Sequence, residues 1–404
     1  MRFLLRLLVV GALAVVLSGC WPTPGAGPDR RNFNPFEQIL TPDNVGELTE
    51  AFRAPLPEGT GPPVVGPSGL FVRTGLNIAA FEPGSGAPRW TVRLPPDDTG
   101  PYEPDMGDPF VIDSSGQVVA TYAIFYASHT RQDRRVTIDA DSGVPVESGS
   151  AGQIHSMRGA EVAVLHHQQC CMQQEVTSIY VYPLSGGQWW GGAAYLFGGT
   201  FSLGVGQLFV ASSNTFHAYD TTTPCPPYSE DDPFLVCLSQ WTHDVGSAVT
   251  PVVIGDGTVY VGSASGHVHA ADAETGVGWS APLGSAVNRS PALADGVLYV
   301  GTADGRLSAM PATGCDGEAC PVSWTTPTGS ASSVQPAVAG GVVFIGSADG
   351  TVSAFDAAGC GAATCQPLWT ADAGAPVTGG LAVFAGRLYV GTHTGLVSYG
   401  LPPG

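Results

Sequence analysis

The stretch TPVVIGDGTVYVGS at residues 250–263 returns as SPALADGVLYVGT at residues 290–302, and two further copies follow at residues 335–347 and 379–392. The glycines that end the second apolar run of each copy, at positions 262, 301, 346 and 391, lie 39, 45 and 45 residues apart. In a strand-rich chain, a period of about 40 to 50 residues indicates a β-propeller.

Each copy predicts one four-stranded unit. The first strand is a short apolar run that ends at a pair such as Asp256-Gly257, which favours a tight hairpin because both residues tolerate positive φ. The second strand alternates, as in VLYV at residues 297–300, and a turn such as Asp349-Gly350 leads into the third. A tryptophan marks the fourth strand, at Trp279, Trp324 or Trp369. Four antiparallel strands of this kind make one blade.

The N-terminal half carries weaker copies of the unit, at residues 61–90, 108–146, 156–190 and 201–241. With the C-terminal copies they predict an all-β, eight-bladed β-propeller of four-stranded antiparallel blades. The last copy stops near Tyr399 without a tryptophan strand, so we expect residues 45–52 to supply the missing strand from the N-terminal end. Such closure removes both open sheet edges.

The charge composition excludes several functions. The net charge is −19, only 12% of residues are charged, and all 15 cations are arginine. Nucleic-acid binding depends on cations that neutralise phosphates, so we expect no nucleic-acid partner. A Schiff-base lysine and a phosphate-loop lysine are excluded because the chain has no lysine. No nucleophile-elbow or zinc-protease motif occurs either.

The first residues resemble a bacterial lipoprotein signal. Arg2 and Arg6 form a short basic region, and an apolar run over residues 7–17 follows and leads into Leu17-Ser18-Gly19-Cys20. We expect residues 1–19 to be a signal peptide, 20–37 to be a lipidated Cys20 with a Pro/Gly-rich tether, and 38–404 to be one propeller domain. An ordinary signal peptide or a membrane helix is the alternative, although the run is short for a bilayer core of about 30 Å.

The repeat resembles that of quinoprotein-type (PQQ-like) propellers. Their signature, Ala-x-Asp-x-x-Thr-Gly before a docking tryptophan, reads AADAETG at residues 270–276 and then Trp279, and LTPDNVGEL at residues 40–48 resembles their closing segment. Such propellers include quinone-dependent dehydrogenases, which hold a metal-bound quinone with carboxylate, amide and cationic side chains. They also include non-enzymatic proteins such as the propeller lipoprotein of the outer-membrane β-barrel assembly machinery. The dehydrogenase ligands do not map onto this sequence residue by residue, and fold alone does not give function.

Six of the nine cysteines recur at one place, the loop before a tryptophan strand. Cys237, Cys320 and Cys365 each lie four residues before the tryptophan, and their upstream partners are Cys225, Cys315 and Cys360. This register predicts three local disulfides in an exported protein. Zinc ligation is the less favoured alternative, because zinc takes four ligands and each loop offers two.

Cys170 and Cys171 are adjacent within HHQQCCM at residues 166–172. We expect a vicinal disulfide in a surface loop between the second and third strands of a blade. The pair resembles the vicinal cysteines that lie against the quinone in the dehydrogenases, which is the strongest argument for a cofactor. A soft-metal site is a second interpretation, because thiolate, thioether and imidazole suit copper; its ligands would be His155, His166, His167, Cys170, Cys171 and Met172.

The first strand of each blade is expected to line the central channel. Residues at its entrance are candidates for a ligand or partner site: Thr250, Asn288, Arg289, Gln335 and Thr378. Arg289 is the only cation between Arg158 and Arg306. An arginine near the axis of an acidic ring suits an anionic ligand, and an ion pair to a neighbouring blade is the structural alternative.

These observations favour binding over catalysis. We expect a monomeric, exported lipoprotein, anchored by lipid on the outside of the cytoplasmic membrane or in the periplasm. It presents loop surfaces to a protein or envelope component and needs no catalytic residue, metal or cofactor. The alternative is an oxidoreductase of alcohols or sugars that uses PQQ with calcium. A third hypothesis is carbohydrate binding by an exposed pair, Trp189 and Trp190.

Overall fold

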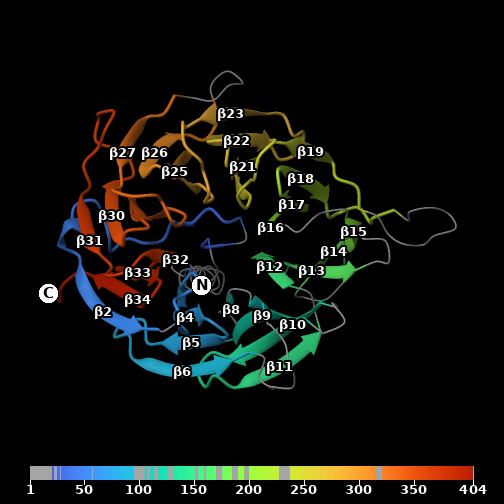
Figure 1. The fold of residues 1–404 in the computed structure, drawn as a ribbon, viewed down its shortest axis with the longest axis horizontal. Helices are drawn as coiled ribbons and strands as arrows, with labels where there is room; N and C mark the ends of the chain where they lie inside the picture. Colours follow the sequence, from blue (N-terminus) through green and yellow to red (C-terminus); the bar gives the residue numbers. More distant parts are fainter. Residues whose placement is uncertain are drawn as a thin grey trace, which may run out of the picture.

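The structure, a computed structural model, describes Trp21 and residues 25–27, 29–56, 58–94, 105–106, 110–112, 117–125, 131–150, 153–158, 161–169, 175–183, 190–194, 200–226, 237–314 and 321–403. Its strands form eight sheets around a central axis (Figure 1). We number the sheets 1 to 8 along the chain. Sequence repeats at 61–90, 108–146, 156–190 and 201–241 correspond to sheets 1 to 4.

The sheets of the N-terminal half are built as follows. Sheet 1 contains β3 (Val64–Gly66), β4 (Gly69–Thr74), β5 (Asn77–Phe81) and β6 (Pro88–Arg93). Sheet 2 contains β7 (Asp105–Met106), β8 (Phe110–Ile112), β9 (Gln117–Phe125), β10 (Arg131–Asp139) and β11 (Pro145–Ser150). Sheet 3 contains β12 (Gln153–Arg158), β13 (Glu161–Gln169), β14 (Glu175–Pro183) and β15 (Trp190–Ala194). Sheet 4 contains β16 (Thr200–Gly204), β17 (Gln207–Ser212), β18 (Thr215–Asp220) and β19 (Trp241–Asp244).

The C-terminal sheets repeat this order. Sheet 5 contains β20 (Val253–Gly255), β21 (Thr258–Gly262), β22 (His267–Asp272) and β23 (Gly278–Pro282). Sheet 6 contains β24 (Ala292–Ala294), β25 (Val297–Gly301), β26 (Arg306–Pro311) and β27 (Trp324–Pro327). Sheet 7 contains β28 (Ala337–Ala339), β29 (Val342–Gly346), β30 (Thr351–Asp356) and β31 (Trp369–Asp372), with β1 (Phe33–Asn34) parallel to β28. Sheet 8 contains β32 (Val377–Phe384), β33 (Arg387–Thr392) and β34 (Gly395–Gly400), joined by β2 (Thr49–Pro55).

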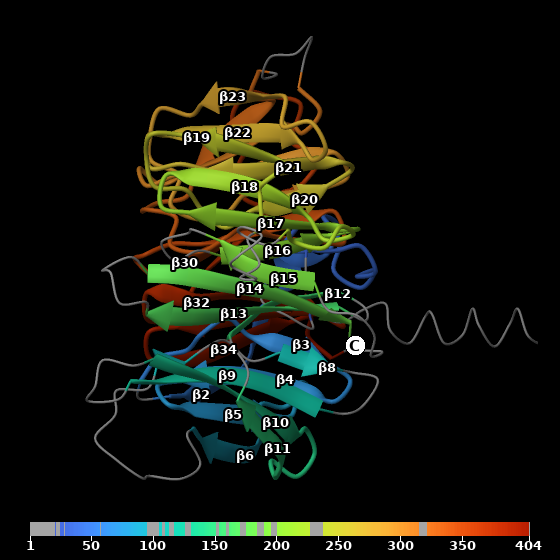
Figure 2. The same ribbon diagram turned by 90° about the vertical axis from the view of Figure 1, so that its right-hand side faces the viewer.

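The four strands of each repeat are antiparallel to their partners and follow one another from the axis outward (Figures 1 and 2). The turn between the first and second strands and the loop between the third and fourth therefore lie on the same side of the ring. We call this side the c–d face, and the opposite side the b–c face. The buried strands read as short apolar runs such as Val342–Gly346, because both faces of each sheet pack against neighbours.

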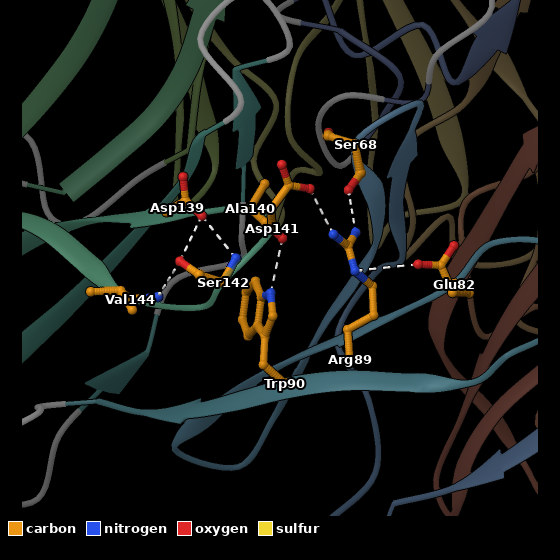
Figure 3. Close-up of polar contacts among 9 residues, drawn as sticks. All are labelled: Ser68, Glu82, Arg89, Trp90, Asp139, Ala140, Asp141, Ser142 and Val144. Carbon is orange, nitrogen blue, oxygen red and sulfur yellow. Dashed lines mark hydrogen bonds and ion pairs between the residues drawn. The ribbon is translucent and has the colours of Figure 1, made fainter.

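Tryptophans of the outer strands join neighbouring sheets. The indole Nε1–H of Trp90 in β6 donates to the carbonyl oxygen of Ala140 in sheet 2 at 2.9 Å (Figure 3). Beside it, Arg89 forms ion pairs with Glu82 at 3.4 Å and Asp141 at 2.7 Å. The turn that receives the indole is shaped by Asp139, which accepts hydrogen bonds from the Ser142 backbone and hydroxyl, and these bonds lower the pKa of the Asp139 carboxyl.

Sheet 8 is made by both ends of the described chain. β2 pairs antiparallel with β34, with Thr49 opposite Gly400 and Pro55 opposite Gly395. We expected the strand at residues 45–52, but Val45–Glu47 form a 3-10 helix, η1, and the strand begins only at Thr49. The helix buries Val45, and Leu48 beyond it accepts a hydrogen bond at its carbonyl oxygen from Trp369 Nε1 at 2.9 Å. None of the helices in the described ranges has the length and hydropathy to span a bilayer.

The segment before residue 38 was expected to be a tether, and several of its described residues contact the inner strands of the propeller. Trp21 is only 1% exposed and forms a two-way backbone bridge with Val65 of β3, at 2.7 and 2.9 Å. Further along, β1 pairs with β28, the first strand of the repeat in sheet 7, and adds a strand on its inner side. The described part of the tether is therefore built into the ring. The predicted signal peptide and Cys20 lie outside the described residues.

Candidate functional site

Residues 29–34, the axial segment, cross the inner strands of sheets 5, 6 and 7 near the middle of the ring (Figure 1). The backbone oxygens of residues 29, 31 and 32 accept hydrogen bonds from the backbone N–H groups of Ile254, Leu293 and Val338, at 2.8, 2.9 and 2.9 Å. Each of those inner strands has three residues and ends at a turn on the c–d face. The segment therefore lies across the c–d end of the axis.

Side chains fix the axial segment in a conformation that its sequence does not favour. Arg30 and Asn32 both have positive φ, at 54° and 53°, a region that non-glycine residues enter at a cost. The buried Asn32 offsets this cost, because its Nδ2 donates to the carbonyl oxygen of Pro336. Gln335 Nε2 donates to the carbonyl oxygen of Arg30 at 3.0 Å and to that of Pro291 at 2.9 Å. Gln335, a predicted site residue, thus anchors the segment.

A cavity of about 170 Å³ remains on the axis beside this segment. The axial segment and Gly25 contribute one wall, and residues at or just before the inner strands of sheets 6, 7, 8 and 1 contribute the others. Its lining consists of Gly25, Arg30, Asn32, Pro62, Arg289, Ser333, Val334, Gln335, Thr378, Gly379, Gly380 and Leu381. Three of the five predicted ligand or partner residues, Arg289, Gln335 and Thr378, are brought together here.

The other two candidates are placed elsewhere. Thr250 is buried, and its hydroxyl accepts a hydrogen bond from the Gly262 backbone at 2.8 Å and donates to the Pro251 carbonyl oxygen at 3.3 Å. Its hydroxyl is therefore occupied within sheet 5. Asn288 is exposed but does not line the cavity. The sequence suggested a common channel entrance for all five, whereas the residues lie at different depths.

Arg289 is the exposed cation of the cavity. The ion pair to a neighbouring blade that was the structural alternative is not formed with any residue in the described ranges. Other arginines are paired: Arg53 with Glu50 at 2.8 Å, Arg306 with Asp304 at 2.6 Å, and Arg31 with Asp29 at 3.0 Å. The Arg289 guanidinium thus keeps its donors available at the mouth of the cavity.

The residues that line the cavity do not fit a calcium-bound quinone. A hard cation needs several oxygen ligands, carboxylates above all, and the described residues of the lining include no aspartate or glutamate. The volume of about 170 Å³ is also below the roughly 300 Å³ at which pockets for larger organic ligands begin. In the described part of the chain, no group of three or more His, Cys, Asp or Glu side chains is arranged to hold a metal ion.

Two of the three predicted loop disulfides are formed in the structure, Cys225–Cys237 and Cys360–Cys365. Both lie in loops on the c–d face. Cys315 and Cys320 lie outside the described residues, as do Cys170, Cys171 and Met172. The side chains of His155, His166 and His167 are likewise not described, so the vicinal disulfide and the soft-metal site stay predictions.

Trp190 is not available for carbohydrate binding. Its side chain is only 7% exposed, and its indole Nε1–H donates to the carbonyl oxygen of Thr223 in sheet 4 at 2.8 Å. The residue docks sheet 3 onto sheet 4 as Trp90 docks sheet 1 onto sheet 2. Trp189 lies outside the described residues. The proposed exposed tryptophan pair is thus wrong for Trp190.

A histidine cluster that was not predicted from the sequence lies between sheets 4 and 5. His267 and His269 alternate along β22, with ring centroids 5.9 Å apart, and His243 approaches from β19. Burial lowers the pKa of His269 to about 4, and the positive charges of His267 and His243 add to the effect. The i, i+2 spacing of His267 and His269 predicts a shared sheet face. The third histidine comes from another sheet, which no local pattern reveals.

Comparisons with known proteins place the fold. Residues 238–360 match the family model described as outer membrane protein assembly factor BamB. The structure resembles BamB from Moraxella catarrhalis, with a TM-score of 0.58 and 17% identity over 87% of this chain and 99% of that one. A search of curated proteins finds no significant match.

Enzymes share the same architecture. The quinohemoprotein alcohol dehydrogenase ADHIIG from Pseudomonas putida HK5 matches with a TM-score of 0.66 and 14% identity, over 96% of this chain and 82% of that one. A computationally designed protein, Ika8, matches with a TM-score of 0.60 and 14% identity, over 87% and 99% of the two chains. The chain therefore has a PQQ-like repeat β-propeller fold related to that of BamB. At these identities the likeness concerns the fold, and the fold serves both binding proteins and oxidoreductases.

Proposed function

We propose that this chain is an exported, lipid-anchored, eight-bladed β-propeller that binds a protein or another envelope component on its c–d face. In this proposal β2 closes the ring, the chain works as a monomer, and it is held on the outside of the cytoplasmic membrane or in the periplasm. BamB-type repeats at residues 238–360 support a protein-binding module.

The observation that carries the proposal is where the exposed apolar side chains lie. Among the described residues, the large hydrophobic side chains that are exposed all belong to turns, loops or strand starts at the c–d side: Phe36, Ile39, Val144, Val146, Val205, Leu238, Val277, Val322 and Leu368. Ile39 belongs to this side because it lies against the turn that contains Gly386, between β32 and β33. An apolar surface gathered on one side of a soluble fold is typical of an interaction face.

Three of these side chains form the most exposed part of the face. Val205, Leu238 and Val277 are 80%, 71% and 74% exposed, and they come from adjoining turns and loops of sheets 4 and 5. Gln207 Nε2 links these loops, because it donates to Gln240 Oε1 at 3.0 Å and to the Ala273 carbonyl oxygen at 2.9 Å. We call Val205, Leu238 and Val277 the apolar patch. Cys237, next to Leu238, is held in the disulfide with Cys225, which restrains the chain beside the patch.

The alternative, a quinone-dependent oxidoreductase, has the same fold but less support from the axis. The cavity is small and its lining offers cationic and amide groups without a carboxylate. Addition of the quinone and calcium to the purified mature chain tests this directly. A stoichiometric chromophore together with dye-linked oxidation of an alcohol or sugar would replace binding by catalysis as the function.

Site-specific crosslinking in cells tests the binding face. A photoreactive amino acid at Val277 or Leu238 should give a protein adduct, whereas the same probe at Ala264, exposed on the b–c face, should not. The triple change Val205→Ser, Leu238→Ser and Val277→Ser should abolish an adduct from a probe at Val322. Adducts only from position 264, or none from the c–d face, would contradict the proposal. Incorporation of labelled fatty acid into the wild-type chain, and not into Cys20→Ala, tests the anchor.

A further inference from the structure

Charge is distributed unevenly between the molecule and its axis. The whole chain has a net charge of −19. Among the described residues, however, those that line the axial cavity include two arginines, Arg30 and Arg289, and no acidic residue. Several acidic groups elsewhere in the described chain pair with arginines, as Asp304 does with Arg306. A local site of positive charge in an acidic protein attracts anions to one place.

The cavity is closed at one end and accessible at the other. The axial segment lies across its c–d end, held by backbone hydrogen bonds to three sheets. Arg289 and Thr378, which line the cavity, are both exposed, so the opening lies on the side of the strand starts, toward the b–c face. The wall at Thr378 includes a β-bulge between Val377 and Gly380 in β32, an irregularity that re-aims side chains and often borders binding sites.

Arg289 provides the recognition chemistry. A guanidinium presents N–H donors in a planar fork that matches the two oxygens of a carboxylate. The donors of Arg289 have no acceptor among the described residues, in contrast to those of the paired Arg53 and Arg306. Arg30, held through its Nε to the Phe201 carbonyl oxygen at 3.2 Å, adds positive charge at the closed end.

We propose that the axial cavity is a binding site for a carboxylate, with Arg289 as its principal ligand. The small volume of about 170 Å³ favours a carboxylate on a short chain over a large ring system. The carboxylate comes either from a free small molecule or from the chain terminus of a partner protein. The site faces away from the apolar patch, and the proposal stands whether or not the c–d face binds a partner.

Calorimetric titration of the purified, mature full-length chain tests the site. The probes are succinate, the tripeptide acetyl-Ala-Ala-Ala with a free carboxylate, and the same tripeptide as its amide. We expect at least one of the two acids to bind and the amide not to bind. Tighter binding of succinate identifies a free small carboxylate as the ligand, whereas tighter binding of the tripeptide acid identifies a chain terminus. Absence of binding by both acids would overturn the proposal.

Two matched variants separate a site from general charge. Arg289→Gln removes the guanidinium and should weaken binding of the acid by roughly tenfold or more, as expected for the loss of a charge-assisted hydrogen bond. Arg306→Gln removes the same charge from an exposed, paired arginine and should leave the dissociation constant within about twofold. Equal weakening of acid binding by both variants would show that the overall charge of the chain, and not a site at Arg289, explains the binding. That result would refute the proposal.

A measurement on the wild-type chain gives a test that does not depend on whether the variants fold. The Nε–H resonance of Arg289, assigned by its loss in Arg289→Lys, should shift during the acid titration with the same dissociation constant. An unchanged resonance while binding heat persists would place the acid elsewhere and contradict the proposal. Failure of this site leaves crosslinking from Val277 unaffected, so the two proposals fail separately.

Discussion

The indole Nε1–H of Trp241 in sheet 4 donates to the carbonyl oxygen of Ala273 in sheet 5, 3.0 Å away. The ring rests on Gly276, three residues further along the same loop, whose φ is +72°. Asp272 shapes that loop by accepting hydrogen bonds from the backbone and hydroxyl of Thr275. The AADAETG signature at residues 270–276 is thus a socket for the tryptophan of the preceding sheet, rather than for the Trp279 that follows it in the sequence.

Gly276→Ala should destabilise the chain strongly. A Cβ atom at this position would meet the Trp241 ring at 2.7 Å, and alanine would also have to keep φ at +72°. We expect a loss of about 2–4 kcal/mol in the free energy of unfolding, from backbone strain and displacement of the ring. Chemical denaturation measures it.

Gly296→Ala is the matched control. Its φ is +76°, but a Cβ there would have nothing within 4 Å, so only the backbone cost of about 1 kcal/mol applies. If the two alanine variants lose the same stability, the contact with Trp241 does not contribute and the socket interpretation is wrong.

The two disulfides on the c–d face should stabilise by different amounts. Cys225–Cys237 closes a loop with a sequence separation of 12 and Cys360–Cys365 one of 5. Loop-closure entropy predicts losses of about 3 kcal/mol for Cys225→Ser with Cys237→Ser, and about 2 kcal/mol for the second pair replaced in the same way. Denaturation of the oxidised chain and both double variants measures the difference. A larger loss for the shorter loop would show that native-state contacts, and not chain entropy, dominate.

Acid should destabilise the fold through the histidine cluster. The pKa of His269 is lowered to about 4 in the folded chain, against about 6.5 for an unfolded histidine. Between these two pH values the unfolded chain binds a proton that the folded chain excludes, so stability decreases as the pH falls from about 6.5 toward 4. The melting temperature should fall between pH 7 and pH 5, and His269→Gln should reduce that fall. Parallel pH profiles for both chains would contradict the assignment.

Asn32→Ala should weaken the hold of the axial segment. The change removes the Nδ2 donor to the buried Pro336 carbonyl oxygen and places alanine at a φ of 53°. We expect a loss of about 2–3 kcal/mol. Amide exchange at Leu293 and Val338, whose N–H groups bond to the segment, should accelerate. In Asn32→Gly, glycine tolerates the positive φ but also lacks the donor. The comparison with Asn32→Ala therefore separates the cost of the lost hydrogen bond from the cost of the backbone conformation. Unchanged exchange in both variants would mean that Asn32 does not hold the segment.

Local pattern was enough to predict much of this molecule. Short apolar runs ended by glycine-containing turns predicted strands β20 to β34 close to their observed positions, because each unit buries its faces against a similar neighbour. The disulfide partners were readable for the same reason, since Cys360 and Cys365 lie in one loop with a repeated register. The start of β2 was misplaced because Val45 and Leu48, apolar like strand residues, are buried by a 3-10 turn instead.

Tertiary structure alone decided the axial segment, the cavity and the histidine cluster. The axial segment, residues 29–34, has no hydrophobic period, and its composition predicts a flexible tether. It is held in place because backbone groups of sheets 5, 6 and 7 supply hydrogen bonds that a local pattern does not encode. Arg289 was recognisable as an isolated cation, but which described residues surround it depends on what the axial segment and sheets 1, 7 and 8 bring to the axis. Periodicity encodes contacts within a repeat, whereas groups that meet at the axis are far apart in sequence and share no period.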